Sequence, residues 1–254
     1  MINFFRKIRQ QLLSQNKVSK YLLYAIGEIA LVMVGILLAL QVNNWNEQKK
    51  ERQIEQKLLQ ALKEEINSNI NQIEQGIKLQ IGYKKMYVAL LEDFANLDRT
   101  IDPILLDSLV EGASAPQNIE IQTGVAKSII ATGDIRYLKN DQIVEFVRMF
   151  EDKISLINQD FERMTNLYVN QLWPLENHRV RRLNRAHLQY YFFKEELPKS
   201  AYKTNWDGFF NDIDLENTYA LALYEYTGTI KREENLLNHM NMVLGLVKAE
   251  LVNP

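Results

Sequence analysis

The stretch YLLYAIGEIALVMVGILLALQV, residues 21–42, decides the architecture of this chain. It is apolar apart from Glu28 and Gln41. As a helix it would be about 33 Å long at ~1.5 Å per residue, enough to cross a hydrocarbon core of about 30 Å. A secretory signal peptide has a shorter apolar region of about 7–15 residues and ends at small residues, whereas this stretch continues into the polar residues 43–47. We therefore expect an uncleaved transmembrane helix.

The flanks of this stretch indicate its orientation. Residues 1–20 carry five basic residues and no acidic residue, whereas residues 43–63 carry five basic and three acidic residues. The Lys and Arg counts tie, and acidic residues have little weight in the positive-inside rule. Moving an all-basic tail outward against the membrane potential nevertheless costs work for every charge. We expect residues 1–20 to form a cytoplasmic amphipathic tail, residues 21–42 to cross the membrane, and residues 43–254 to form an extracytoplasmic domain.

Glu28, Gly35 and Ala39 are the candidate contact residues of the transmembrane helix. Steps of seven and four residues keep them on one helix face, and Gly35 and Ala39 form a small-x-x-x-small pair that lets two membrane helices approach closely. A carboxylate inside a membrane is costly and by default has a partner. The alternative is that Glu28 is protonated or extends to the interface. We expect this face to bind a second copy of the chain or another membrane protein.

Composition excludes several function classes for the rest of the chain. Five of the 30 basic residues lie in the tail and one of the 32 acidic residues lies in the span, so residues 43–254 carry a net charge of −6. An acidic domain is poorly suited to bind nucleic acid over a broad face. The chain has no cysteine and three histidines without ligand or triad spacing, and no phosphate loop or catalytic motif occurs. We expect no enzyme activity, catalytic residue, metal or cofactor.

The pattern of apolar residues after the span predicts an all-α fold, an extended antiparallel bundle of long helices. We expect helices at residues 46–94, 104–110, 123–132, 140–173, 175–193 and 215–251. Asp102-Pro103 should start the second of these helices. The N-terminal caps of later helices should be Thr123, Asn140 or Asp141, and Asp212 or Asp214. Gly133 should adopt a left-handed conformation.

Two stripes of residues are expected to face the core. The first helix has isoleucines in steps of 4, 3, 4 and 4, close to the eleven-residue repeat of a nearly straight or slightly right-handed coiled coil: Ile66, Ile70, Ile73, Ile77 and Ile81. The core face of the last helix is predicted to contain Leu221, Tyr224, Thr227 (or Gly228), Leu236, Met240, Val243 and Val247.

A family resemblance is carried by KYLLYAIGEIALVMVGILLALQVNNWNE at residues 20–47 and SIIATGDIRYLKNDQIVEFV at residues 128–147. These segments resemble an uncharacterised family of bacterial single-pass membrane proteins, a domain of unknown function. The resemblance implies a Gram-negative envelope protein with an N-terminal anchor and a helical domain. With the orientation inferred from the flanks, we expect the anchor in the inner membrane and the domain in the periplasm. The resemblance implies no activity.

Arg181, Arg182 and Arg185 are the candidate anion-binding residues, because guanidinium groups close together could hold a phosphate or carboxylate. The alternative is a helix face that is solvated or paired with local acids. Glu176, Glu195 and Glu196 are such acids.

Two function classes remain. The first is an interaction protein, a membrane-tethered helical scaffold or accessory subunit that forms oligomers or joins a larger envelope complex. The second is an extracytoplasmic ligand-sensing bundle, since small molecules can bind between helices. A tail of 20 residues carries no output domain, so a sensor would need a partner to signal. We therefore favour the first class.

Overall fold

The computed structural model describes residues 18–98, 100, 102–113, 117–185 and 197–252. These residues are largely helical and contain no strand, which confirms the all-α prediction for them. Most of the predicted tail, residues 1–17, lies outside the described part of the chain. Contacts divide the chain into two compact units, residues 1–55 and 56–254. The boundaries predicted at residues 20 and 42 stay predictions.

Helix α2 (Val18–Ala95) is one uninterrupted helix of 78 residues. The predicted span and the predicted helix from residue 46 therefore belong to one element. No proline occurs in it, and its glycines are isolated, so no residue removes a backbone hydrogen bond from the helix.

Short elements follow, and their ends have the expected chemistry. Helix α3 (Pro103–Gly112) begins after Asp102, whose carboxylate accepts hydrogen bonds from two backbone N–H groups of the first turn. Helix α4 (Gly124–Ala131) is followed by Gly133, which has a φ of 74°. This left-handed conformation suits glycine, which has no Cβ to clash, and it precedes the 3₁₀ turn η1 (Asp134–Tyr137).

The second long helix, α5 (Asp141–Leu167), is capped by Asn140 as predicted, but the region after it differs from the prediction. The chain continues through a π-helical turn, η2 (Tyr168–Leu172), into α6 (Trp173–Asn177). Pro174 does not stop the helix because it lies in the first turn of α6, where a missing N–H is tolerated. The predicted helix 175–193 is helical at its first three residues, which belong to α6, but it is wrong at residues 178–181, which separate α6 from α7 (Arg182–Arg185). Its residues 186–193 lie outside the described part of the chain.

The last two helices are α8 (Trp206–Phe210) and α9 (Ile213–Val252). The Asp212 carboxylate accepts hydrogen bonds from the N–H groups of Asp214 and Leu215, so Asp212 caps α9 as predicted. The aromatic side chains of α8 pack on the end of α2, where the rings of Phe94 and Phe209 lie 5.2 Å apart.

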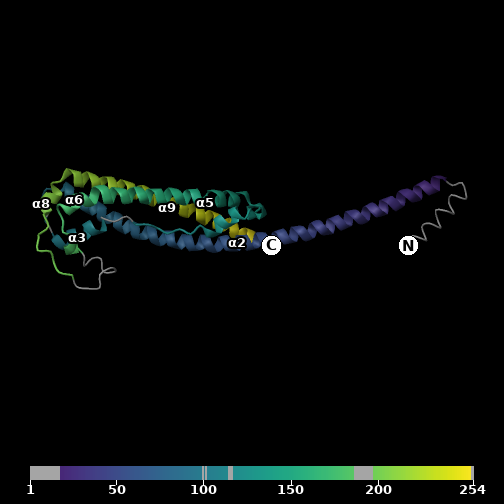
Figure 1. Ribbon diagram of the computed structural model, residues 1–254, viewed down its shortest axis with the longest axis horizontal. Coiled ribbons are helices and arrows are strands. Elements are labelled where there is room, and N and C mark those ends of the chain that lie inside the picture. Colours follow the sequence, from purple (N-terminus) through teal and green to yellow (C-terminus); the bar gives the residue numbers. More distant parts are fainter. Residues whose placement is uncertain (1–17, 99, 101, 114–116, 186–196, 253–254) are drawn as a thin grey trace. The chain divides into compact units, whose positions relative to one another are not determined.

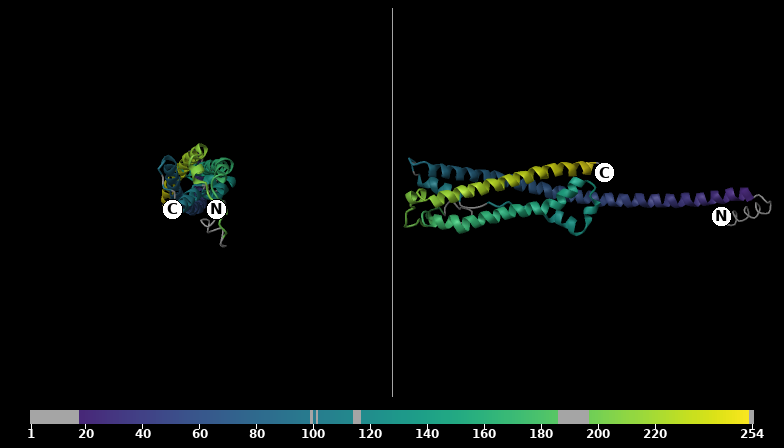
Figure 2. Two further views of the ribbon diagram at one scale, coloured as in Figure 1. Left: turned by 90° about the vertical axis from the view of Figure 1, so that its left-hand side faces the viewer. Right: turned by 90° about the horizontal axis from the view of Figure 1, so that it is seen from above.

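Within residues 56–252, α9 packs along both other long helices (Figure 1). Near the end of α9, the Glu250 carbonyl accepts a hydrogen bond of 3.1 Å from Nε2 of Gln56 on α2. Near the start of α9, the ring of Tyr219 lies 6.0 Å from that of Phe94 on α2. Against α5, contacts also run in opposite sequence order, from Phe146 beside His239 to Arg163 beside Glu225. Figure 2 shows α5 and α9 side by side from a second direction.

The predicted core stripes are confirmed in part. Ile66, Ile70, Ile73 and Ile77 are buried, but Ile81 is 41% exposed, because the stripe of buried residues on α2 moves to Tyr87 and Leu90. On α9 the predicted residues Leu236, Met240, Val243 and Val247 are buried.

The first half of α9 has a different core face from the predicted one. Leu221 is 45% exposed and Tyr224 is 75% exposed, while Tyr219, Ala222 and Tyr226 are buried. This segment, YALALYEYTGTI, has apolar residues on every side. Periodicity cannot choose between such faces, so the neighbouring helices decide.

An extended segment, residues 117–123, lies along α2. Asn69 holds it with two hydrogen bonds of 2.8 Å to the backbone N–H and carbonyl of Gln122. The Glu65 carboxylate accepts from the N–H groups of Val125 and Ala126 at 2.7 and 3.2 Å. Thr123 lies at the predicted cap position of α4 but makes no side-chain capping bond, so Glu65 of another helix caps α4.

Candidate functional site

The predicted membrane-contact residues lie on one continuous helix. Glu28, Gly35 and Ala39 all belong to α2, so steps of seven and four residues place them within about 40° of one another around the axis at ~100° per residue. A Cβ added at Gly35 would meet no atom within 4 Å. The face therefore has room for close approach of another helix.

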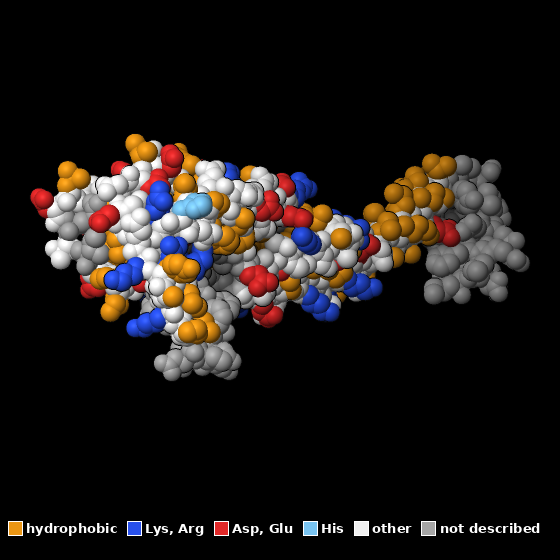
Figure 3. Space-filling model, turned by 60° about the vertical axis from the view of Figure 1, so that its left-hand side comes forward, with side chains coloured by type: hydrophobic (Ala, Val, Ile, Leu, Met, Phe, Trp, Pro, Cys, Tyr) orange, Lys and Arg blue, Asp and Glu red, His pale blue; other side chains and the backbone are white. Residues whose placement is uncertain are grey.

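The apolar side chains around these residues are exposed. From Leu22 to Val42 the large hydrophobic side chains have exposed fractions of 53–77%. Figure 3 shows hydrophobic side chains gathered on this part of the helix. Among the described residues, α2 is the one helix that is long and apolar enough to cross a membrane. Apolar surface of this extent is unfavourable in water.

The structure brings two arginines of the predicted anion site, Arg182 and Arg185, to one carboxylate, and gives Arg181 a different partner. Arg185 is 1% exposed, and its guanidinium lies 3.5 Å from one carboxylate oxygen of Glu176 and 3.5 Å from one of Glu111. Arg182 is more exposed and lies 3.4 Å from the same Glu176 oxygen. The guanidinium of Arg181 instead covers the ring of Tyr202, 5.7 Å from its centre.

Glu176 is therefore the centre of this cluster. Its carboxylate is fully buried and also accepts a hydrogen bond from the Tyr219 hydroxyl at 2.5 Å. For Arg182 and Arg185, the structure therefore shows the alternative that the sequence left open, pairing with a local acid. The other two candidate acids, Glu195 and Glu196, lie outside the described residues. Anion binding at Arg181, Arg182 and Arg185 stays a prediction.

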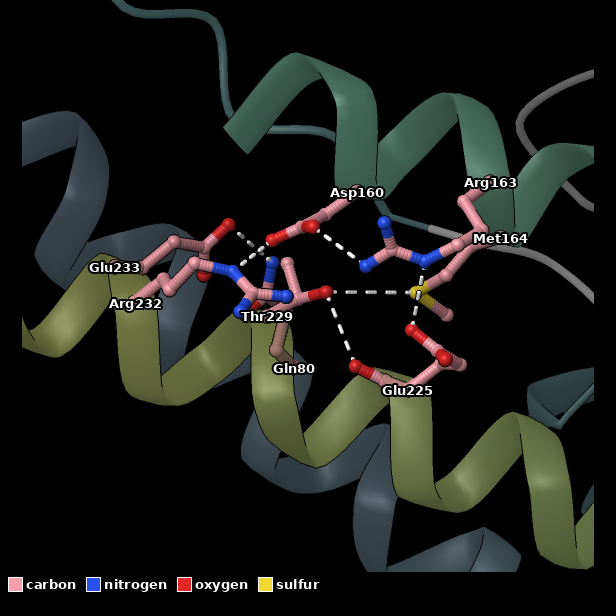
Figure 4. Close-up of polar contacts among 8 residues, drawn as sticks. All are labelled: Gln80, Asp160, Arg163, Met164, Glu225, Thr229, Arg232 and Glu233. Carbon is pink, nitrogen blue, oxygen red and sulfur yellow. Dashed lines mark hydrogen bonds and ion pairs between the residues drawn. The ribbon is translucent and has the colours of Figure 1, made fainter. Parts of the chain in front are cut away.

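A second polar cluster lies where α2, α5 and α9 meet (Figure 4). Asp160 of α5 is buried and pairs with two arginines, Arg163 of its own helix at 2.6 Å and Arg232 of α9. Arg163 also binds Glu225 of α9 at 3.0 Å, and these hydrogen bonds raise the pKa of its guanidinium. Thr229 donates a hydrogen bond to the Glu225 carbonyl one turn before it.

Glu233 is the most unusual member of this cluster. It is 1% exposed, and Nε2 of Gln80 donates a hydrogen bond of 3.1 Å to its Oε1. Burial raises the pKa of the Glu233 carboxyl to about 7; the Gln80 hydrogen bond lowers it and the negative charge of Asp160 raises it. Buried carboxyl groups with a perturbed pKa are typical of functional sites and of structural polar networks.

Other titratable groups in the core behave as packing residues. Burial raises the pKa of the Tyr168 and Tyr226 hydroxyls. Burial also lowers the pKa of His239, whose ring lies edge-on to Phe146 at 5.3 Å. In the part of the chain that the structure describes, no three acidic or histidine side chains gather to hold a metal ion.

Sequence reasoning missed Gln80, Asp160 and Glu233. The available signal was their position, since each interrupts an apolar stripe: Glu233 lies seven residues from both Tyr226 and Met240. Polar residues at such positions are buried when the helix packs, and buried polar groups need partners.

The comparisons with known proteins find a match to an uncharacterised family. Residues 28–101 match DUF6090, a family of unknown function. This match covers residues 28–42 of the apolar stretch and all of α2 after it, ends at residue 101, and does not reach residues 128–147. No curated protein and no solved structure matches the chain. The chain is therefore similar, over less than a third of its length, to an uncharacterised family.

Proposed function

We propose that this chain is a non-enzymatic scaffold or accessory subunit of a bacterial envelope complex. Residues 21–42 cross the inner membrane once, and residues 43–254 lie in the periplasm. The observation that carries this proposal is the contrast along α2: its large hydrophobic side chains from Leu22 to Val42 are exposed, whereas Ile66, Ile70, Ile73 and Ile77 are buried in a packed core. Lipid is the solvent that suits the first set.

The periplasmic helices form an extended antiparallel bundle in this proposal. The opposite sequence order of the contacts of α9 with α2 and with α5 supports it. Long helices present large lateral surfaces to partners and, among the described residues, hold no metal-binding group. Such a domain suits assembly better than chemistry.

A reporter fusion tests the topology. Alkaline phosphatase, which folds in the periplasm, is fused after Pro254 and compared with a reporter that is active in the cytoplasm. Phosphatase activity supports the proposal. Activity of the cytoplasmic reporter alone would overturn both the orientation and the envelope role.

Crosslinking in membranes tests the assembly. The face of Glu28, Gly35 and Ala39 binds a second copy or another membrane protein, so Glu28→Ala and Gly35→Leu should weaken crosslinks that the wild type forms. Gly27→Leu is the matched control, because Gly27 also has no atom within 4 Å of an added Cβ and lies about 80° around the helix from Gly35. If all three variants keep every wild-type crosslink, this face does not assemble.

Native mass spectrometry of the detergent-extracted protein distinguishes the two function classes. A scaffold should retain further copies or co-purifying subunits. A bound small molecule without a protein partner would instead favour the ligand-sensing bundle.

A further inference from the structure

The contact between Gln80 of α2 and Glu233 of α9 has two oxygen atoms without a hydrogen-bond donor. Nε2 of Gln80 lies 3.1 Å from Glu233 Oε1 and 3.5 Å from the Gln117 carbonyl oxygen. Both acceptors lie on the nitrogen side of the Gln80 amide, so the hydrogen bonds agree with this assignment of its nitrogen and oxygen atoms. Oε1 of Gln80 and Oε2 of Glu233 are then buried without a partner.

One proton would change this balance. An ionised carboxylate only accepts hydrogen bonds, so beside Gln80 it leaves the amide oxygen without a donor. A neutral carboxylic acid has one O–H donor and one carbonyl acceptor. A primary amide likewise has both a donor and an acceptor, so the two groups can each donate to the other. A proton on Glu233 Oε2 would supply the donor that this pair of groups lacks, and an unpaired buried polar group is costly.

The charges around Glu233 also favour the neutral acid. Figure 4 places Gln80 of α2, Asp160 of α5 and Arg232 of α9 next to it, with Arg163 on the far side of Asp160. Tyr226 of α9 interacts with its charge, and Tyr83 and Tyr87 of α2 lie beside Tyr226. Asp160 is negative, and both arginines are paired with it. The raised pKa of Glu233, to about 7, agrees with this environment.

We propose that Glu233 is a neutral carboxylic acid in the folded protein, and that its proton holds α9 against α2, so that this contact loosens when the proton leaves. This is a pH-sensitive lock inside the helical domain, and it does not depend on the proposed scaffold function. Its protonated fraction falls from about 90% at pH 6 to about 10% at pH 8 for a pKa of about 7.

Infrared difference spectroscopy of the full-length protein in detergent tests the protonation. The wild type should show a carboxylic acid C=O band at pH 6 that falls to roughly a tenth of its intensity by pH 8, and Glu233→Gln should lack this component. Glu65→Gln is the control: Glu65 is also buried, but both its oxygens already accept backbone N–H bonds, so its loss should leave the band unchanged. A band that is unchanged in Glu233→Gln would overturn the proposal, as would its absence from the wild type at pH 6.

Spin-label distances test the lock. The chain has no cysteine, so Lys78→Cys on α2 and Asn238→Cys on α9, both at exposed positions, give one labelled pair. The distance distribution between the labels should broaden in the wild type between pH 6 and 8 and stay constant in Glu233→Gln. A distribution that does not change with pH in the wild type, or that broadens equally in the variant, would show that the proton does not control this contact.

Discussion

Gly76 of α2 faces Ile119 of the extended segment, and Gly76→Ala tests that contact. A Cβ at residue 76 would lie 2.4 Å from both Cγ1 and Cδ1 of Ile119, which is 7% exposed. Alanine gains about 1 kcal/mol over glycine in a helix interior. Displacing Ile119 from its buried position costs about 2–3 kcal/mol, the upper part of the range for an overpacked core. We expect Gly76→Ala to destabilise the domain by about 1–2 kcal/mol.

The same substitution should have the opposite sign once Ile119 is shortened. Ile119→Ala alone should cost about 2–5 kcal/mol, and it removes the two atoms that clash. In that background Gly76→Ala should stabilise by about 1 kcal/mol, a coupling within the range for residues in contact. Chemical unfolding of the full-length protein in detergent, followed by circular dichroism, measures each corner of this double-mutant cycle.

Gly245→Ala is the control for the helix-propensity effect, because an added Cβ on this exposed α9 residue would meet no atom within 4 Å. It should stabilise by about 1 kcal/mol in both backgrounds. If Gly76→Ala behaves like Gly245→Ala in the wild-type background, then the segment of residues 117–123 does not pack on α2 at Gly76, and the reasoning is refuted.

Three buried carboxylates give further predictions. The raised pKa of Glu233 contributes stability that is fully present below its unfolded pKa of about 4.5 and is lost as the pH rises through about 7. Glu233→Gln should therefore match the wild type at pH 4 and be more stable by about 3 kcal/mol above pH 8, as measured by denaturant titrations across pH; a difference that does not vary with pH would contradict this. Glu65→Ala should cost about 1–2 kcal/mol by removing the cap of α4, and hydrogen exchange of the Val125 amide should accelerate while that of α9 amides does not. Glu176→Gln should cost about 3–5 kcal/mol because it leaves the buried charge of Arg185 undercompensated, and adding Arg185→Met should recover much of that loss in thermal unfolding; no recovery would show that the cost has another origin.

The sequence predicted those features of the fold that depend on nearby residues. Asp102, Asn140 and Asp212 cap helices because each side chain binds backbone N–H groups two or three residues later. Gly133 needs a left-handed φ for a reason that lies within one turn. Pro174 was misleading, because its effect depends on whether the residues before it can change to a π-helical turn.

The candidate site was predictable only where it lies on one helix. Glu28, Gly35 and Ala39 share a face by spacing alone. The contact between Gln80 and Glu233 joins residues 153 positions apart, and it forms only if particular faces of α2 and α9 meet. Since the first half of α9 is apolar on every side, its sequence could not identify that face.

The polar contacts explain why α9 adopts one register on its neighbours. A slide of one helical turn, about 5.4 Å or four residues, would replace many core side chains of α9 by others that are also buried and apolar: Tyr226 by Ile230, Leu236 by Met240, and Val243 by Val247.

The same slide would break three polar contacts at once. Gln80 would lose Glu233, Asp160 would lose Arg232, and Glu176 would lose the Tyr219 hydroxyl. Each loss leaves a buried polar group with one partner fewer, at a cost of about 1–3 kcal/mol, more for a charged group. The apolar contacts therefore stabilise α9 in several registers, and we infer that the buried polar residues, which add little net stability themselves, select the observed one.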